Sequence, residues 1–474
     1  MPVNTTFHPE YSEMLPVVTA VRDACGGDPT IKAKRELYLP ADFAKDPATG
    51  AYTDHYIGYI NRAYFLGVTG RTKESMIGMV FRKDPTVELP PQLEAFSEDI
   101  DGAGQSLEQI SKDMVGEMLE AGKYFLLVDY PQADEGTDSE TEARLGLRPT
   151  IATYRFENLI NWHFEGRKGR QVLTRAVLKE FVDANDEDEF SHLKEARYRV
   201  LRLRDGVYTQ QLYDQFGDPD EYGEYIPRMA GGQPFDHIPL HIAGAKTNLP
   251  TVDMPPLYDV ARANIAHYQT TANVMESGYV GTQPMLHVDV GETDLTEWAQ
   301  HNPGPLSFGN RHGLKTKGGK LEVVQAQATD YNREVKTDIE GEMVALGAQL
   351  VQRGGQAETA EAARINASAE SSVLDVVVGN ASEAIEGALE DFALFLGVNP
   401  TGVQYKLNDS YWESGLSAQD LQAVTAARQL GSFGDRDVLY MIRQGRIQLD
   451  PAREDDDILE DAASGLVDNL PDQM

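Results

Sequence analysis

The sequence contains one cysteine, Cys25, among its 474 residues. A single cysteine excludes an internal disulfide framework and any metal site built from several thiolates. We interpret Cys25 as a small buried residue of the first helix rather than a reactive thiol. No apolar run approaches the roughly 18 residues that a membrane span needs, and the first residues lack the basic and apolar regions of a secretory signal. We therefore expect a protein that has no membrane partner and folds in a reducing cytoplasm.

Basic residues are scarce. The chain has 42 Lys and Arg against 76 Asp and Glu, which gives a formal net charge of −34. A free-standing nucleic-acid binder needs a basic surface, because neutralisation of phosphates supplies most of its affinity. Two interpretations stay open: the protein never meets DNA, or it handles DNA without gripping it. We interpret acidic pairs such as Asp183/Asp186 and Asp455/Asp457 as solvated surface.

Recognisable catalytic motifs are also missing. The sequence has no GxxxxGK[ST] phosphate loop, no HExxH and no GxSxG, which argues against an ATP-driven motor and against the common hydrolase sites. Several histidines lack the spacing of metal ligands, and we expect them to be structural or solvated: His192, His267, His287, His301 and His312. We expect no enzyme activity, no cofactor and no metal.

The first 250 residues have the pattern of a mixed α/β body. Apolar residues at helical spacing occur at 56–66 and 73–81, with breaks predicted at Gly67 and Gly70. Ser106 and Gln109 form a capping box that opens a helix, and Gly122 ends it. Strand patterns follow at residues 124–128, 149–154, 172–181 and 198–203.

Long helices dominate from residue 255 onward. One helix is predicted from Leu257 to Gly278 and another over 330–350, with short strands at 285–290 and 321–325 between them. A third helix is predicted over 357–396 and ends at Gly397. A final helical unit runs from Ser417 to about residue 444, and an acidic tail follows from residue 450. A chain of this length needs two or three packing units.

Two short segments stand out. No acidic residue occurs from Trp298 to Leu321, although Arg311, Lys315, Lys317 and Lys320 fall within ten positions. This segment contacts nucleic acid or an acidic protein surface, or its lysines only keep an exposed loop soluble. The second segment is a polar break at 351–357, where two adjacent glycines favour an abrupt change of chain direction.

The order of these elements resembles that of portal proteins of tailed bacteriophages. Within them the chain is similar to a family often labelled only as a domain of unknown function, over about residues 50–430. The stretches that carry this resemblance are IGMVFRKDPTV at 77–87, LVDYP at 127–131, YRFENLINW at 154–162, YRVLRL at 198–203, PPLYD at 255–259, AHY at 266–268, LGAQL at 346–350 and ETA at 358–360.

The resemblance implies a helix-rich α+β portal fold assembled as a dodecameric ring. Its parts would be a wing at 1–256, stem helices at 257–279 and 328–350, and a clip at 280–327. A tunnel loop would occupy 351–358, a long wing helix and its return 359–415, and a crown with the acidic tail 416–474. The residues nearest DNA in the channel would be Gln352, Arg353, Gly354, Gly355 and Gln356. If the polar break is instead an ordinary turn on the outer surface, those residues lie away from DNA.

The resemblance also implies a function and partners. A portal ring at one capsid vertex admits double-stranded DNA driven by the terminase, releases it at ejection, and docks head-completion or tail adaptors. Its other partners would be the major capsid and scaffold proteins, and it would assemble in the host cytoplasm and reside in the virion. Residues Arg311, His312, Lys315, Lys317 and Lys320 of the clip would contact terminase, adaptor or DNA. The rival interpretations are another virion structural protein, such as an adaptor, and an acidic hydrolase with an unrecognised carboxylate site.

Overall fold

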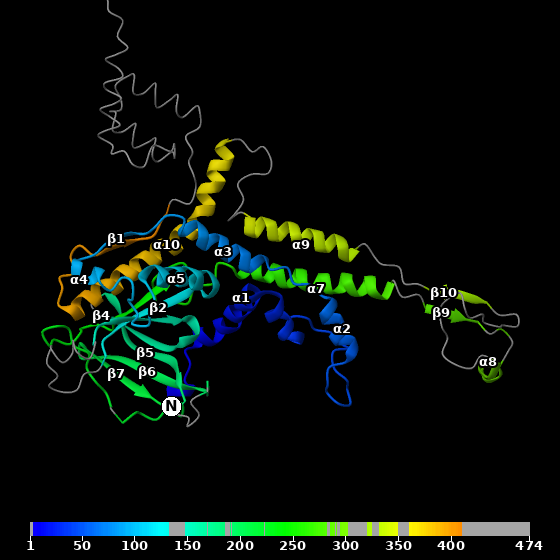
Figure 1. Ribbon diagram of the computed structural model, residues 1–474, viewed down its shortest axis with the longest axis horizontal. Coiled ribbons are helices and arrows are strands. Elements are labelled where there is room, and N and C mark those ends of the chain that lie inside the picture. The colour runs from blue at the N-terminus through cyan, green and yellow to red at the C-terminus, as the bar shows by residue number, and fades with distance from the viewer. Residues whose placement is uncertain are drawn as a thin grey trace, which may run out of the picture. The chain divides into compact units, whose positions relative to one another are not determined.

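The computed structural model describes most of the first 409 residues (Figure 1). The described residues are 3–131, 147–167, 169–184, 190, 192–221, 223–281, 285–289, 291, 294–301, 320–324, 331–348 and 360–409. The chain divides into two compact units, Met1–Leu407 and Asn408–Met474, and the elements below belong to the first. The fold is α+β, as the sequence predicted.

The body consists of helices of different lengths and two antiparallel sheets. Its helices are η1 (Val3–Thr5), α1 (Pro9–Ala33), η2 (Arg35–Leu37), α2 (Asp54–Arg62), α3 (Val68–Val80), α4 (Pro91–Glu94), α5 (Leu107–Ala121) and η3 (Phe156–Asn158). Its strands are β1 (Thr86–Glu88), β2 (Lys123–Asp129), β3 (Thr150–Arg155), β4 (Leu159–Arg167), β5 (Arg170–Asp183), β6 (Lys194–Arg204), β7 (Val207–Tyr213) and β8 (Leu240–Gly244).

The two sheets differ in how deeply they are buried. The three-stranded sheet has the order β3-β2-β8, and its central strand β2 is buried on both faces from Lys123 to Val128. The four-stranded sheet is the meander β4-β5-β6-β7, in which β5 pairs with β6 from Arg175–Arg202 to Asp183–Lys194. Strand β6 is buried at Tyr198, Val200, Leu201 and Leu203 and exposed at both ends.

Three long helices follow the body. They are α7 (Tyr258–Gly281), α9 (Tyr331–Ala348) and α10 (Ala360–Leu396). Between α7 and α9 lie β9 (Met285–Val288), α8 (Leu295–His301) and β10 (Leu321–Val324), and β11 (Gln404–Lys406) follows α10. Strands β9 and β10 form an antiparallel ribbon, and β11 pairs with β1.

Helix α10 returns the chain to the body. It packs on α5, β2, β8 and β11 (Figure 1). From Ala381 to Phe395 only Glu383 and Glu390 are exposed, so this half of the helix is surrounded on nearly all sides. Gly397 has φ +70° and ends the helix where the sequence predicted.

Two glycine predictions need correction. Gly70 was expected to break a helix, but it lies inside α3, where an added Cβ would come within 2.7 Å of the Cys25 carbonyl oxygen. The glycine therefore permits α1 and α3 to approach closely. Gly278 was expected to end a helix, yet α7 continues to Gly281, because a single exposed glycine costs a helix only about 1 kcal/mol.

Other predictions about the body are confirmed or corrected by the same elements. Ser106 and Gln109 form the predicted capping box of α5, and Gly122 ends that helix with φ +79°. Burial and the nearby Glu120 raise the pKa of Cys25, which fits an unreactive thiol, although Cys25 is half-buried rather than fully buried. Asp183, from the acidic pair Asp183/Asp186, is exposed, as expected, and its carboxylate lies 3.7 Å from the Lys194 ammonium.

Candidate assembly arm

Helices α7 and α9 pack side by side (Figure 1). The β9–β10 ribbon lies between them in the sequence. We call residues 258–348 the arm. Helix α7 also packs on α1, α2 and α3, so it joins the arm to the body. Its start is fixed by two backbone hydrogen bonds, from Leu257 N to Leu119 O and from Tyr258 N to Pro255 O.

The root of α7 is tied to α3 by one buried asparagine. Asn264 is fully buried, and its Oδ1 accepts hydrogen bonds from the backbone N and the hydroxyl of Thr69, at 3.2 and 3.0 Å. Its Nδ2 donates to the Leu66 carbonyl at 2.7 Å. Because the residue preceding α3, Gly67, has no side chain to cap the helix, Asn264 supplies a cap from another element.

A buried histidine joins the two arm helices. The His267 side chain on α7 is 2% exposed, and its Nε2 lies 3.1 Å from Glu340 Oε1 on α9. Lys336 reaches the same oxygen at 3.0 Å. The hydrogen bonds from Lys336 and His267 lower the pKa of Glu340. His267 is therefore structural, as the sequence analysis expected.

Helix α2 braces the far half of α7. The Tyr59 hydroxyl donates to Asn273 Oδ1 at 2.7 Å, and the Arg62 guanidinium and His55 both bind the Glu276 carboxylate. Partial burial of Glu276 favours its neutral form, but the hydrogen bonds from Arg62 and His55 outweigh this and lower its pKa. The Arg62 guanidinium also lies 3.9 Å from the centre of the Tyr279 ring.

The far end of the arm exposes apolar side chains. On α7 the side chains from Asn273 to Val280 are exposed or half-buried, with Met275 at 46% and Val280 at 48% of their area exposed. On α9, Leu346 is 38% exposed and Met343 is buried, but both lie toward the body, because α9 runs antiparallel to α7 and its Glu340 already pairs with His267. Exposed apolar residues close together on one helix, such as Met275 and Val280, are typical of a surface that another protein covers.

The ribbon carries the one described member of the predicted basic segment. Lys320 is exposed, and its backbone exchanges two hydrogen bonds with that of Asp289, which extends the β9–β10 pairing by one residue. Arg311, His312, Lys315 and Lys317 lie outside the described residues. The predicted tunnel-loop residues Gln352, Arg353, Gly354, Gly355 and Gln356 also lie outside them. Their roles stay predictions.

Helix α8 was not predicted, because the stretch between the ribbon strands was interpreted as loop. It begins after Asp294, whose Oδ1 accepts hydrogen bonds from the backbone N of Thr296 and of Glu297 at 2.8 and 3.4 Å. These backbone hydrogen bonds lower the pKa of Asp294. An aspartate before Leu295 is a helix-start signal that the sequence offered.

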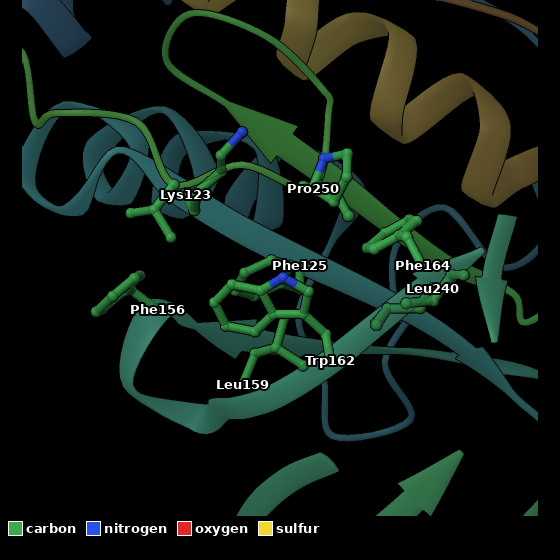
Figure 2. A pocket seen from close by; sticks show the side chains of 11 residues that line it. Lys123, Phe125, Phe156, Leu159, Trp162, Phe164, Leu240 and Pro250 are labelled. Carbon is green, nitrogen blue, oxygen red and sulfur yellow. The ribbon is translucent and has the colours of Figure 1, made fainter. Parts of the chain in front are cut away.

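The enclosed cavity within the body offers little room for chemistry. One cavity between β2, β4 and β8 has a volume of about 10 Å³, and Figure 2 shows the side chains of Phe125, Trp162 and Leu240 pointing into it. That space holds at most one water, and its walls are almost entirely apolar. The described residues, which Figure 1 shows in colour, contain no group of three or more His, Cys, Asp or Glu side chains that could hold a metal ion.

A wider groove of about 840 Å³ lies on the surface between the β1 region and the loop before β11. Its carboxylates are all on exposed side chains: Asp84, Glu88, Glu94, Glu98 and Glu108. Glu108 is held by Lys112 at 2.5 Å. The groove is therefore an open acidic surface rather than an enclosed carboxylate pocket.

One ionic cluster was missed from the sequence. His237, His241 and Asp391 meet where the segment leading into β8 contacts α10. The available signal was the pair of histidines four residues apart within the apolar stretch 234–242. Their partner Asp391 lies about 150 residues further along the chain, so no local pattern could identify it.

Comparison with known proteins gives the following likenesses. A family model described as a domain of unknown function (DUF4055) matches residues 256–396, which run from the start of α7 to the last residue of α10. No curated protein matches the chain. In the part of the chain that the structure describes, no helix is both long and apolar enough to cross a membrane.

Two solved structures resemble the chain. One is a chain of the virion of a native gene transfer agent (GTA) particle, with 12% identity, a TM-score of 0.38, and coverage of 80% of this chain and 89% of that one. The other is a chain of the neck of an empty GTA particle with C6 symmetry, with 12% identity, a TM-score of 0.38, and coverage of 82% and 93%.

Proposed function

We propose that the chain is a portal subunit that assembles into a ring at one vertex of a phage-like capsid. The observation that carries this proposal is the arm: a helix pair braced to the body at its root and with exposed apolar residues at its far end. In a closed ring each arm would pack against two neighbours, which would bury Met275 and Val280. The resemblance of the local sequence stretches to portal proteins supports the same assignment.

The parts of the proposed ring follow the order of the elements. The body would be the wing, α7 and α9 the stem helices, and the segment between them the clip. Residues 351–358 would be the tunnel loop that leads into α10, and residues 416–474 the crown. Helix α10 follows that loop in the chain and packs on the body. This packing supports a subunit in which the channel residues are anchored to the wing.

The charge of the chain supports a channel that does not hold DNA. With a net charge of −34 on each of twelve copies, much of the ring surface is negative. A negative channel wall repels phosphate and denies the duplex a deep binding minimum, so DNA slides rather than binds. The terminase would supply the energy of packaging, and the subunit itself would not be an enzyme. Head-completion or tail adaptors and capsid and scaffold proteins would be its other partners in the virion.

The first test is the size and shape of the purified full-length protein. We expect a closed ring of about twelve chains with an axial channel, visible in single-particle images. A stable monomer or dimer at micromolar concentration would contradict the ring and favour an adaptor or a hydrolase.

A second test concerns the clip. A variant in which Arg311, Lys315, Lys317 and Lys320 are all replaced by Glu should still form intact rings but should bind terminase or the adaptor more weakly. Undiminished packaging and tail joining would mean that these lysines serve only solubility.

A further inference from the structure

Two histidines converge on one buried carboxylate beneath α10. The Nε2 atom of His237 lies 3.0 Å from Asp391 Oδ2, and the Nε2 atom of His241 lies 2.9 Å from the same oxygen. The Nδ1 atom of His237 lies 2.9 Å from Asp236 Oδ1. Asp391 is 4% exposed and belongs to α10, whereas Asp236 and His237 precede β8 and His241 lies within it. We call these four residues the clasp.

The backbone of α10 is adapted to this contact. A Cβ added at Gly387 would come within 2.8 Å of His241 Nδ1, so the glycine lets the imidazole lie against the helix. One turn beyond Asp391 on α10, Phe395 packs on Phe235 with ring centres 4.5 Å apart. The clasp and the aromatic contact together bind the C-terminal half of α10 to the segment before β8.

Both nitrogens of His237 face a carboxylate. A neutral imidazole has one N–H donor, so it satisfies only one of Asp236 and Asp391 and turns a lone pair toward the other. An imidazolium donates to both. The arrangement in the structure is therefore complete only when His237 carries its second proton.

We propose that the clasp depends on the second proton of His237. With that proton the clasp fixes the C-terminal half of α10 to the body, and loss of the proton loosens this half of the helix. This device does not depend on the ring proposal, because every member belongs to one chain. It would make the anchoring of α10 tighter in neutral and mildly acidic solution than in alkaline solution.

The pKa values agree in direction with the geometry. The hydrogen bond with Asp391 raises the pKa of His237 from 6.5 to about 9, although burial favours the neutral ring. Burial favours neutral Asp391, but the hydrogen bonds from His237 and His241 lower its pKa from 3.8 to about 2. The contribution of His237 is therefore complete below about pH 6.5 and is lost as the pH rises through about 9. The contribution of Asp391 is present above about pH 3.8 and is lost as the pH falls through about 2.

The other charged groups on elements that pack against α10 have partners of their own or are exposed. On α5, Lys112 pairs with Glu108. On β2, Asp129 pairs with Arg199, and the buried Lys123 pairs with Asp253. At the end of β3, Arg155 lies 3.3 Å from Glu117, and on β11, Lys406 is exposed. On α10 itself, Glu383 accepts a hydrogen bond from Asn248, Glu386 accepts one from the Tyr405 backbone, and Glu390 is exposed. The charged side chains with the largest effect on the pKa of His237 are Asp391 and Asp236.

The test is hydrogen exchange of the full-length protein between pH 6 and pH 9.5. Protection factors, which remove the intrinsic pH dependence of exchange, are compared for amides of residues 381–396 and for α5 as an internal reference. Release of one proton changes protection by at most tenfold per pH unit. Because the His237 side chain is 43% exposed and partly screened, we expect a fall of roughly tenfold over the whole range from pH 6.5 to 9.

Three variants and a control separate the clasp from general alkaline loosening. His237→Gln and Asp391→Asn should each make the protection of 381–396 lower and independent of pH. Asp236→Asn lets a neutral His237 accept a hydrogen bond at Nδ1, so the fall should shrink or begin at lower pH. His192→Gln, at an exposed histidine in the β5–β6 connection, should behave as the unmodified protein does.

The proposal is overturned if protection of 381–396 follows α5 at every pH, or if His237→Gln keeps the fall. Should Asp391→Asn fail to fold, His237→Gln and Asp236→Asn still decide the matter. Both changes lie outside α10, and the Asp236 side chain is 91% exposed.

Discussion

The C-terminal half of α10 and the far half of α7 differ in how far each is covered by the rest of the chain. From residue 381 to 395, α10 meets the body on nearly every side, with apolar packing around Phe392 and an ionic contact at Asp391. From Asn273 onward, α7 contacts the body mainly through polar groups of α2 and leaves Met275 and Val280 in solvent. One helix completes its packing within the chain, and the other does not.

This difference locates stability and assembly in separate places. A helix buried on all faces contributes apolar burial of about 1.5–3 kcal/mol for each large side chain. A helix held by partly exposed ion pairs gains little from them, since such pairs contribute about 0–1 kcal/mol each. We therefore expect changes in α10 to act on the folding of the chain and changes in distal α7 to act on its association.

The largest expected effect is on folding. Phe392 is fully buried and packs on Phe96 with ring centres 5.5 Å apart. Phe392→Ala should lower the free energy of unfolding by about 3–5 kcal/mol, because it removes the ring and leaves a cavity. Urea denaturation of the purified protein measures this. The matched control is Val376→Ala on the same helix, where the side chain is 42% exposed and the loss should stay below about 1 kcal/mol. Equal losses at the two positions would contradict the contrast.

The next effect concerns the root of the arm. Ile265 is half-buried in the first half of α7, one residue after the asparagine that caps α3. Ile265→Pro removes one helix hydrogen bond and kinks α7 at a cost of roughly 3 kcal/mol or more. We expect loss of closed rings in native sizing, while Ile265→Ala, which keeps the helix, should still form them. Closed rings of normal size from the proline variant would show that α7 does not bear on assembly.

Much of the fold followed from local patterns in the sequence. The capping box at Ser106, the strands of the ribbon and the end of α10 at Gly397 were each predicted within a few residues, because each depends on neighbours in the chain. Strands β4, β7 and β8 were not predicted. The apolar residues of β7 and β8 are interrupted by Gln and His side chains, whose partners lie on other elements: Gln210 of β7 accepts a hydrogen bond from Arg199 of β6 at 2.8 Å, and His241 of β8 contacts Asp391 of α10.

The sites were harder to predict than the elements. Gly70 looked like a helix breaker because the sequence could not show the Cys25 carbonyl that faces it from α1. Nothing in the sequence singled out Asn264, although it caps a helix about 195 residues earlier in the chain. Contacts between distant segments of this kind leave no periodic signal in a single sequence, so they became visible only in the structure.

The smallest effect on folding should accompany a clear effect on assembly. Met275 and Val280 are about half-exposed on distal α7, and glutamine is at least as good a helix former as valine. The double variant Met275→Gln, Val280→Gln should therefore change the free energy of unfolding by no more than about 0.5 kcal/mol per site.

If these side chains are buried between neighbouring arms, each glutamine replaces an apolar contact with an amide that must give up water. The ring of the double variant should then dissociate at a higher protein concentration than the ring of the unmodified protein. Mass photometry across a dilution series measures the fraction of closed rings. Phe216→Gln is the control, because it removes an exposed apolar side chain from the loop after β7, away from the arm, and should leave the dilution curve unchanged. If the double variant and the control give the same curve as the unmodified protein, distal α7 is not the contact between copies. In that case the incomplete packing of α7 would point to an adaptor or another virion protein as the partner that covers it.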